Sequence, residues 1–338
     1  MTFELDTSDV SQSSNNTSNY EKTDYDAMNA HVIEAAGTQS KAKTLVGFPV
    51  GLYDLGLQPR APYEEVYDPS DARSKEAVEK GEATVEKRDS YYDDGKWLKD
   101  VEVFVKPRKP AKAVAIAVDF PQITVDKGQF FGNSNPAPLR LIMGGNWMVK
   151  NPEDESKKMR IIQSPFYLNE NTGNPAGEWA LGNRTNLFKM GEAADLLNEN
   201  GNFKASDVAK LLGKALMFKI QVFQKPDKKD PSKSYYTETI KFVSEVPEGL
   251  PTPELDSSLI HGLNMNRANP DYALQMARGI VKNTMMLSEG WEKSVIKVEL
   301  ESKANKSNKD DKPTEVEQKP SPTTNAEVSD GFDEDIPF

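Results

Sequence analysis

Alternating apolar and polar positions predict a series of short strands in the central part of the chain. Valine, leucine, isoleucine or methionine recurs at about every second position in residues 98–105, 114–118, 139–143 and 159–162. This period of two is typical of a strand with one buried face. Pro107 and Pro121 follow the first two runs and Gly144-Gly145 follows the third, so each strand is expected to end there.

The strongest strand signal has the form of a hairpin. Residues 214–224 carry an apolar residue at every second position, and residues 235–243 return with the same period. The charged sequence at residues 226–231 separates the two runs. The pattern predicts a long antiparallel hairpin with a mobile, cationic tip.

Other segments have a helical period or leave two possibilities open. Apolar residues recur at helical spacing between residues 190 and 212, where Ser206 is expected to cap a second short helix. The Asn-Pro pair at the start of residues 269–287 favours one continuous helix. Residues 295–300 alternate again and predict a last strand. Residues 70–87 fit either a helix or a long ordered excursion.

Both ends of the chain are polar. Residues 1–42 are acidic, and their first half is rich in Ser, Asn and Thr, while residues 301–329 are rich in Lys, Asn, Asp, Pro, Thr and Glu. Such sequence buries too little apolar surface to order itself. We therefore expect a disordered N-terminal segment, a folded body over residues 43–300, a disordered linker, and a separate acidic tip at residues 330–338.

The distribution of charge changes what the total charge implies. The formal net charge is −11, which taken alone argues against binding to nucleic acid. However, the acidic excess lies at the two ends of the chain, and residues 96–242 carry 23 Lys and Arg against 16 Asp and Glu. A basic centre between acidic ends is compatible with a polyanionic ligand.

The composition excludes several kinds of catalysis. The chain contains no cysteine, which excludes disulfides, thiol chemistry and cysteine-zinc sites. Its two histidines, His31 and His261, lie far apart in the sequence. It has no phosphate-binding Gly-rich motif ending in Gly-Lys-Ser/Thr, no apolar run that could span a bilayer and no signal peptide. We expect a non-enzymatic intracellular protein without cofactor, metal ion or membrane partner.

The last residues have the chemistry of a detachable ligand at the end of a tether. An acidic triplet precedes an apolar tripeptide that ends on the free α-carboxylate: Asp333, Glu334, Asp335, Ile336, Pro337 and Phe338. The phenylalanine ring can enter a hydrophobic pocket while the carboxylates pair with a basic rim. A tail that only increases solubility would not need Ile or Phe at the terminus.

These residues closely resemble the C-terminal tip of bacterial single-stranded-DNA-binding proteins. The body is more similar to phage-encoded proteins of the same function. In those proteins an OB-type domain ends in a helix and a hairpin. A similar end is found in this chain, with Leu-Leu-Gly-Lys at residues 211–214, the following hairpin with Tyr235-Tyr236-Thr237, and Val-Pro-Glu-Gly at residues 246–249. The resemblance covers some 40 residues of the body.

The resemblance implies a mainly β fold with α insertions, built as an OB-like antiparallel barrel with a helical insert and disordered tails. It further implies sequence-nonspecific binding of single-stranded DNA in phage replication, recombination or repair, in the cytoplasm of an infected bacterial host. The tip would recruit replication, recombination or repair proteins, and it is able to compete with DNA. Association with further copies of the chain stays open.

Nonspecific binding to single strands needs cations along the phosphates and aromatic faces for unstacked bases. The central region interleaves the two. The candidate contacts are Lys106, Arg108, Lys112, Arg140, Trp147, Lys150, Arg160, Trp179, Arg184, Phe188, Tyr235, Tyr236 and Lys241. Trp97 and Trp291 fit the core as well as the surface. The alternative is a replication or recombination accessory protein that docks through the tip and does not bind DNA.

Overall fold

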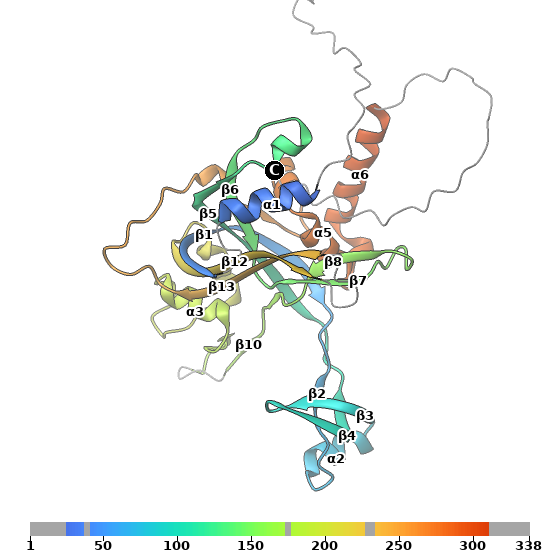
Figure 1. Cartoon of the computed structure of the whole chain (residues 1–338). Helices are drawn as coiled ribbons and strands as arrows, with labels where there is room; N and C mark the ends of the chain where they lie inside the picture. Colours follow the sequence, from blue (N-terminus) through green and yellow to red (C-terminus); the bar gives the residue numbers. More distant parts are fainter. Residues whose placement is uncertain (1–24, 37–40, 173–176, 227–233, 311–338) are drawn as a thin grey trace, which may run out of the picture.

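The computed structural model describes residues 25–36, 41–172, 177–226 and 234–310, except the side chains of residues 25, 234, 235 and 303–310. Within these residues the main sheet follows the strand order β13-β12-β1-β5-β6 (Figure 1). Its strands are β1 (Lys43–Gln58), β5 (Ala111–Val125), β6 (Ala137–Ile142), β12 (Leu216–Pro226) and β13 (Ser234–Ser244). All neighbours in this order are antiparallel. At the margins, β14 (His261–Leu263) runs parallel to β1, and β9 (Phe166–Tyr167) runs antiparallel to β5.

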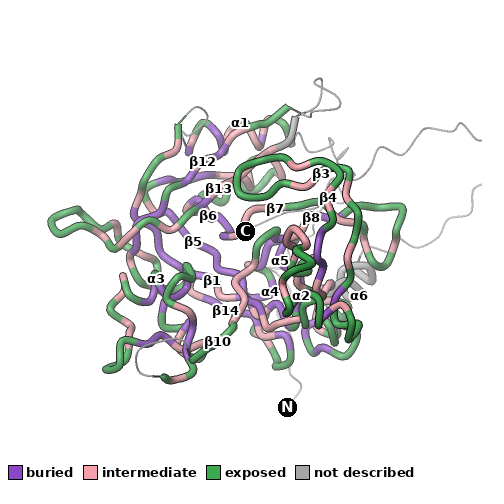
Figure 2. The backbone as a smooth tube through the Cα atoms, turned by 90° about the horizontal axis from the view of Figure 1, so that it is seen from below, coloured by how far each residue is buried: buried purple, intermediate pink, exposed green. Residues whose placement is uncertain are grey.

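The main sheet curls around a hydrophobic core. Its two end strands, β6 and β13, lie close to each other, but no hydrogen-bonded ladder joins them among the described residues. The core between them includes Ile116, Phe120, Leu141 and Phe218, all buried, and the tube of β5 is coloured as buried along much of its course in Figure 2. The prediction of a mainly β fold with antiparallel strands and helical insertions is confirmed. The strands form an open sheet, however, and not the closed barrel that we expected.

The predicted hairpin of residues 214–243 is confirmed. Strands β12 and β13 pair antiparallel from Met217 opposite Ser244 to Pro226 opposite Ser234. The charged turn between them, expected to be mobile, lies outside the described residues.

Strand β5 is longer than predicted, because it continues past Pro121 to Val125 with an irregular register. The continuation is stabilised because the side chain of Val125, like that of Ile123, is buried.

The N-terminal segment contains a helix, which corrects the expectation of disorder throughout residues 1–42. Helix α1 (Tyr25–Ala36) packs against β5 and β12. Val32, Ile33 and Ala36 are buried in the same core as Phe120. His31 also accepts a hydrogen bond from the backbone nitrogen of Asp126 (3.2 Å). The apolar side of this one short helix therefore orders it against the body.

An arm projects from the body between β1 and β5 (Figure 1). It consists of β2 (Tyr63–Val66), α2 (Ala72–Glu79), β3 (Thr84–Asp93) and β4 (Lys96–Lys106), with β4 between the other two strands. A small separate cluster of Ala77, Ala83 and Phe104 holds α2 against the strands. The segment around residues 70–87 is thus both helical and part of an ordered excursion. The Asp71 side chain caps α2 by accepting from the backbone nitrogens of residues 73 and 74.

A C-terminal helical module covers the outer face of β1 and β5. It comprises α4 (Asp271–Met276), α5 (Gly279–Met286), the 3₁₀ turn η4 (Trp291–Lys293) and α6 (Val295–Asp310). Ala113, Ala115 and Ala117 are small and fully buried on this face of β5. Because they project so little, helical residues such as Ala273 and Val281 pack into the same cluster.

Three sequence predictions fail in this module. The single helix expected over residues 269–287 is two helices, because Arg278 adopts an extended conformation between α4 and α5. The strand expected at residues 295–300 is the start of α6. Ile296 and Leu300, four residues apart, contact the core while Val298 is exposed. This is the period of a helix, and α6 continues to Asp310 inside the expected disordered linker.

Between β6 and β12 the chain forms a hairpin and a helical insert. The hairpin is β7 (Asn146–Lys150) with β8 (Lys158–Ile162), and it packs against α5. The insert contains β10 (Glu170–Asn171), β11 (Ala180–Leu181), α3 (Asn186–Ala193) and the 3₁₀ helix η2 (Ala205–Leu211). Ser206 does not cap η2, because the residue at its N-terminal boundary is Lys204.

Candidate nucleic-acid interface

The outer face of the β12–β13 hairpin carries cations and no acid. Alternation along the strands turns Phe218, Ile220 and Val222 into the core, where they are buried. The positions between them face outward. This outer set, called the hairpin face below, consists of Lys219, Gln221, Phe223, Lys225, Thr237, Thr239 and Lys241. Among these described residues there is no carboxylate.

Two lysines on the hairpin face lie directly opposite each other. Lys219 pairs with Lys241 across β12 and β13, and Thr44 of β1 is the next residue along the same row. Both lysine side chains are exposed, and neither forms an ion pair with a carboxylate in the part of the chain that the structure describes. Like charges that face each other across a sheet are destabilising. A phosphate between them would relieve this repulsion.

The inner side of β13 is anchored by a buried ion pair. The Arg278 guanidinium donates to Glu238 Oε2 at 2.7 Å, and the two side chains are 7% and 9% exposed. Burial by itself raises the pKa of Glu238, but the charges of Arg278 and Lys127 lower it by more, so the net pKa lies below the usual value. The pair joins β13 to the break between α4 and α5 and so fixes the hairpin to the C-terminal module.

Phe188 lies in the interior, which corrects one predicted stacking residue, and Tyr236 is half-buried with its hydroxyl turned inward. The Tyr236 hydroxyl is buried beside Glu238, and burial raises the pKa of Tyr236 well above its usual value. Phe188 of α3 is 8% exposed and belongs to the main core. Phe188 therefore presents no face to a base, whereas the Tyr236 ring packs partly buried against the same core. The neighbouring Tyr235 lies opposite Lys225 in the register, and its side chain is outside the described part.

Arg140 is also unavailable to a ligand as a free cation. Its guanidinium makes two hydrogen bonds to the Asp119 carboxylate, at 2.7 and 2.8 Å, and its side chain is 10% exposed. Asp119, on the adjacent strand, is fully buried. The sequence indicated a phosphate contact, but the structure assigns this arginine to the neutralisation of a buried acid.

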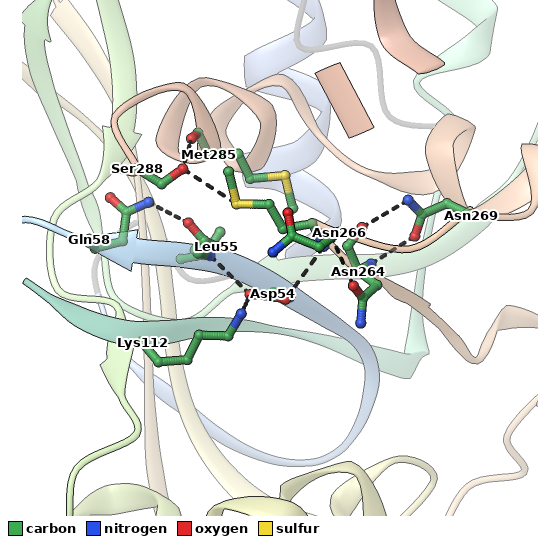
Figure 3. Close-up of polar contacts among 11 residues, drawn as sticks. Asp54, Leu55, Gln58, Lys112, Asn264, Asn266, Asn269, Met285 and Ser288 are labelled. Carbon is green, nitrogen blue, oxygen red and sulfur yellow. Dashed lines mark hydrogen bonds and ion pairs between the residues drawn. The ribbon is translucent and has the colours of Figure 1, made fainter. Parts of the chain in front are cut away.

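The cations at the root of the arm are engaged with neighbours. Lys106 forms an ion pair with Glu82 (3.0 Å), and the Arg108 guanidinium lies 5.5 Å from the centre of the Tyr63 ring. Lys112 forms an ion pair with Asp54 at 2.5 Å (Figure 3). These three candidate phosphate contacts are therefore partly satisfied within the protein.

The surroundings of Asp54 explain why Lys112 is held there. Asp54 accepts hydrogen bonds from the backbone nitrogens of Gly56 (2.9 Å) and Met265 (3.4 Å), as Figure 3 shows. Gly56 has a φ of +75°, and a Cβ at this position would lie 2.3 Å from the Met265 sulfur. Glycine is required because the chain turns tightly against the C-terminal module. Lys112 on β5 thus pairs with a β1 carboxylate that is itself fixed by two backbone hydrogen bonds.

The remaining candidates divide between two separate surfaces. Trp147 is 60% exposed on β7, with Lys150 exposed and Arg160 half-buried on the same hairpin. Trp179 is 66% exposed just before β11, and Arg184 is exposed before α3. Figures 1 and 2 both place α3 and the β7–β8 hairpin on opposite sides of the main sheet. The predicted residues therefore do not form one continuous groove.

Sequence reasoning missed Lys219 and the aromatic pair on the arm. Lys219 occupies an outward position of a strand whose alternation was recognised, so the same signal could have identified it. Trp97 and Tyr92 are 71% and 57% exposed at the end of the β3–β4 hairpin, with ring centres 5.3 Å apart. Their pairing across the strands needed the register of β3, which the pattern did not supply. Trp291, by contrast, is buried.

Comparison with known protein families, with curated proteins and with solved structures finds no match to this chain. Among the described residues, no group of His, Asp and Glu side chains is arranged to hold a metal ion. In the same residues, no helix has the length and apolar character needed to cross a membrane. The predicted protein-interaction residues 333–338 lie outside the described part of the chain.

Proposed function

We propose that the chain binds single-stranded DNA without sequence preference through a main sheet that is an opened OB-type barrel. Numbered along the chain, β1, β5, β6, β12 and β13 correspond to strands 1 to 5. Strand 1 pairs with strands 2 and 4, strand 2 with 3, and strand 4 with 5, and helices α3 and η2 lie between strands 3 and 4. This connectivity supports an OB-type Greek key whose last pairing, between strands 3 and 5, is open.

The observation that carries the proposal is the pair of exposed lysines on an acid-free hairpin face. A single strand presents phosphates at regular intervals, and lysines that track them release counterions on binding. Phe223 is half-buried on the same face, so part of its ring is available to a base. Threonine and glutamine side chains complete a polar surface that suits any sequence.

Replacing both Lys219 and Lys241 with alanine should weaken binding to oligo(dT) and reduce its salt dependence. Each phosphate contact contributes about −0.7 to the slope of log K against log salt for single strands. The double variant should therefore show a slope shallower by about 1.4. Fluorescence anisotropy of a labelled oligo(dT) at several salt concentrations measures both quantities.

The matched control removes two exposed lysines elsewhere. Lys75→Ala/Lys293→Ala changes the net charge equally but alters the arm and the η4 turn, so it should leave the slope near that of the unmodified chain. If the unmodified chain does not bind oligo(dT) at low salt, the proposed function is wrong. The accessory-protein alternative would then remain.

The acidic tip is proposed to recruit partner proteins and not to grip DNA. Deleting residues 330–338 removes four side-chain carboxylates and two phenylalanines, one of them terminal, so affinity for oligo(dT) should stay the same or increase. The truncated chain should no longer retain replication and repair proteins that the full chain retains from a bacterial extract. A large loss of DNA affinity on truncation would contradict this division of roles.

A further inference from the structure

A cleft of about 510 Å³ lies beside the end strand β6 and is not explained by the hairpin face. One wall is the connection between β5 and β6, the other is α4, and the floor comes from the start of β6. The residues that matter for its chemistry are Lys127, Phe131, Asn133, Asn135, Tyr272 and Gln275. Its volume falls in the range of small-molecule sites.

The first wall is held in a fixed shape. The Asp126 carboxylate accepts hydrogen bonds from the backbone nitrogens of Gln129 (3.2 Å) and Asn135 (2.9 Å) and from Ser134 Oγ (2.6 Å). A Cβ on Gly128 would lie 2.1 Å from the Asn133 carbonyl oxygen. The loop is therefore closed tightly on itself before any ligand binds.

The second wall is anchored from behind. Ala273 and Leu274 of α4 are buried against the body, which leaves Tyr272 and Gln275 on the side that lines the cleft. The Tyr272 side chain is 49% exposed. An aromatic ring that is half exposed on a fixed helix costs little conformational entropy when it stacks on a ligand.

The lining combines the groups that recognise a nucleobase. Two aromatic rings, Phe131 and Tyr272, offer flat apolar faces, and three carboxamides offer donors and acceptors for the polar edge of a base. Arg140 lines the floor but is satisfied by Asp119. Besides Arg140, the charged residues of the lining are one acid, Asp256, and one cation, Lys127.

The cleft is also close to the hairpin. Its floor strand β6 lies close to β13, and the charge of Lys127 reaches Glu238 of β13. A strand that crosses the hairpin face therefore has a short path over the open side of the sheet to the cleft.

We propose that this cleft holds one unstacked nucleobase of the bound DNA strand, with Tyr272 as the stacking residue. The inference rests on the proposed function, because the base reaches the cleft as part of a strand held elsewhere. Tyr272 belongs to the C-terminal module and not to the main sheet, so the module contributes directly to binding.

The test compares Tyr272→Ala with the unmodified chain on two oligonucleotides of equal length. Stacking of one base is typically worth about a 5- to 150-fold difference in affinity, so Tyr272→Ala should weaken binding to oligo(dT) by that order. An oligonucleotide with abasic sites throughout should bind both chains equally. Tyr272→Phe keeps the ring and should retain affinity, and Val298→Ala removes exposed apolar surface from α6 of the same module as a control.

A second measurement locates the base directly. Photo-crosslinking of an oligonucleotide that contains 5-iodouracil, followed by mass spectrometry, should attach the base to the peptide that contains Tyr272 or Phe131. Equal affinity of Tyr272→Ala and the unmodified chain for oligo(dT) would overturn the inference and leave the proposed function intact. Failure of the unmodified chain to bind either oligonucleotide would overturn both.

Discussion

Replacing Arg278 with methionine should lower the free energy of unfolding by about 3–5 kcal/mol. The variant leaves the Glu238 carboxylate buried without its closest positive charge, the Arg278 guanidinium at 2.7 Å. A buried ion cannot recover the hydration that it lost on folding. Urea denaturation followed by circular dichroism measures the change, and a loss below 1 kcal/mol would show that the pair does not anchor β13.

The double variant separates the ion pair from simple packing. In Arg278→Met/Glu238→Leu both charges are replaced by apolar groups, and such replacements are often neutral or stabilising. We therefore expect most of the lost stability to return. If the double variant were as unstable as Arg278→Met alone, packing of the arginine side chain at the break between α4 and α5 would explain the effect.

Acid should destabilise the protein between about pH 6.5 and pH 4 through His261. Burial lowers the pKa of this imidazole to about 4, whereas in the unfolded chain it is about 6.5. The unfolded state therefore takes up a proton first as the pH falls. The stability from neutral His261 is fully present above pH 6.5 and lost as the pH falls towards 4, by about 3 kcal/mol in total.

The hydrogen bonds of His261 determine which nitrogen of the neutral imidazole carries the hydrogen. The Leu259 carbonyl oxygen accepts from Nδ1 (2.8 Å), so Nδ1 carries the hydrogen and Nε2 accepts from the Tyr53 hydroxyl (2.8 Å). His261→Gln should therefore flatten the pH dependence measured by denaturation across this interval. Tyr53→Phe is the control, because it removes a hydrogen bond but leaves the buried imidazole. An unchanged pH dependence in His261→Gln would disprove the assignment.

The local sequence pattern predicted those elements in which the spacing of apolar residues alone determines which side chains are buried. The β12–β13 hairpin and β6 have one apolar face each, so alternation was enough. The start of α6 was misjudged because Val295, Ile296 and Val298 favour a strand by composition, whereas contacts of Ile296 and Leu300 with the core select a helix. Helix α1 was missed because its four buried residues follow a polar, acidic sequence.

The exposure of several candidate site residues could be predicted, because it also follows from the local sequence. Exposed Trp147, Trp179 and Lys241 were identified from polar neighbours, which are local. Arg140 was misjudged because its carboxylate partner, Asp119, lies 21 positions away on another strand. The cleft could not be predicted, since its walls are the β5–β6 connection and α4, which only the packing of the C-terminal module brings together.

The position of the arm has a consequence for how the chain folds. Pairing β1 with β5 requires Gln58 and Ala111 to meet, which closes a loop of about 50 residues. The β3–β4 hairpin turns within the two residues Asp94 and Gly95, both with positive φ, so the arm can form from near neighbours. Once formed, the arm shortens the effective loop to about 10 residues and lowers the entropic cost of closing it by about 1.4 kcal/mol. The arm thereby acts as an internal scaffold that brings the two central strands of the body into register.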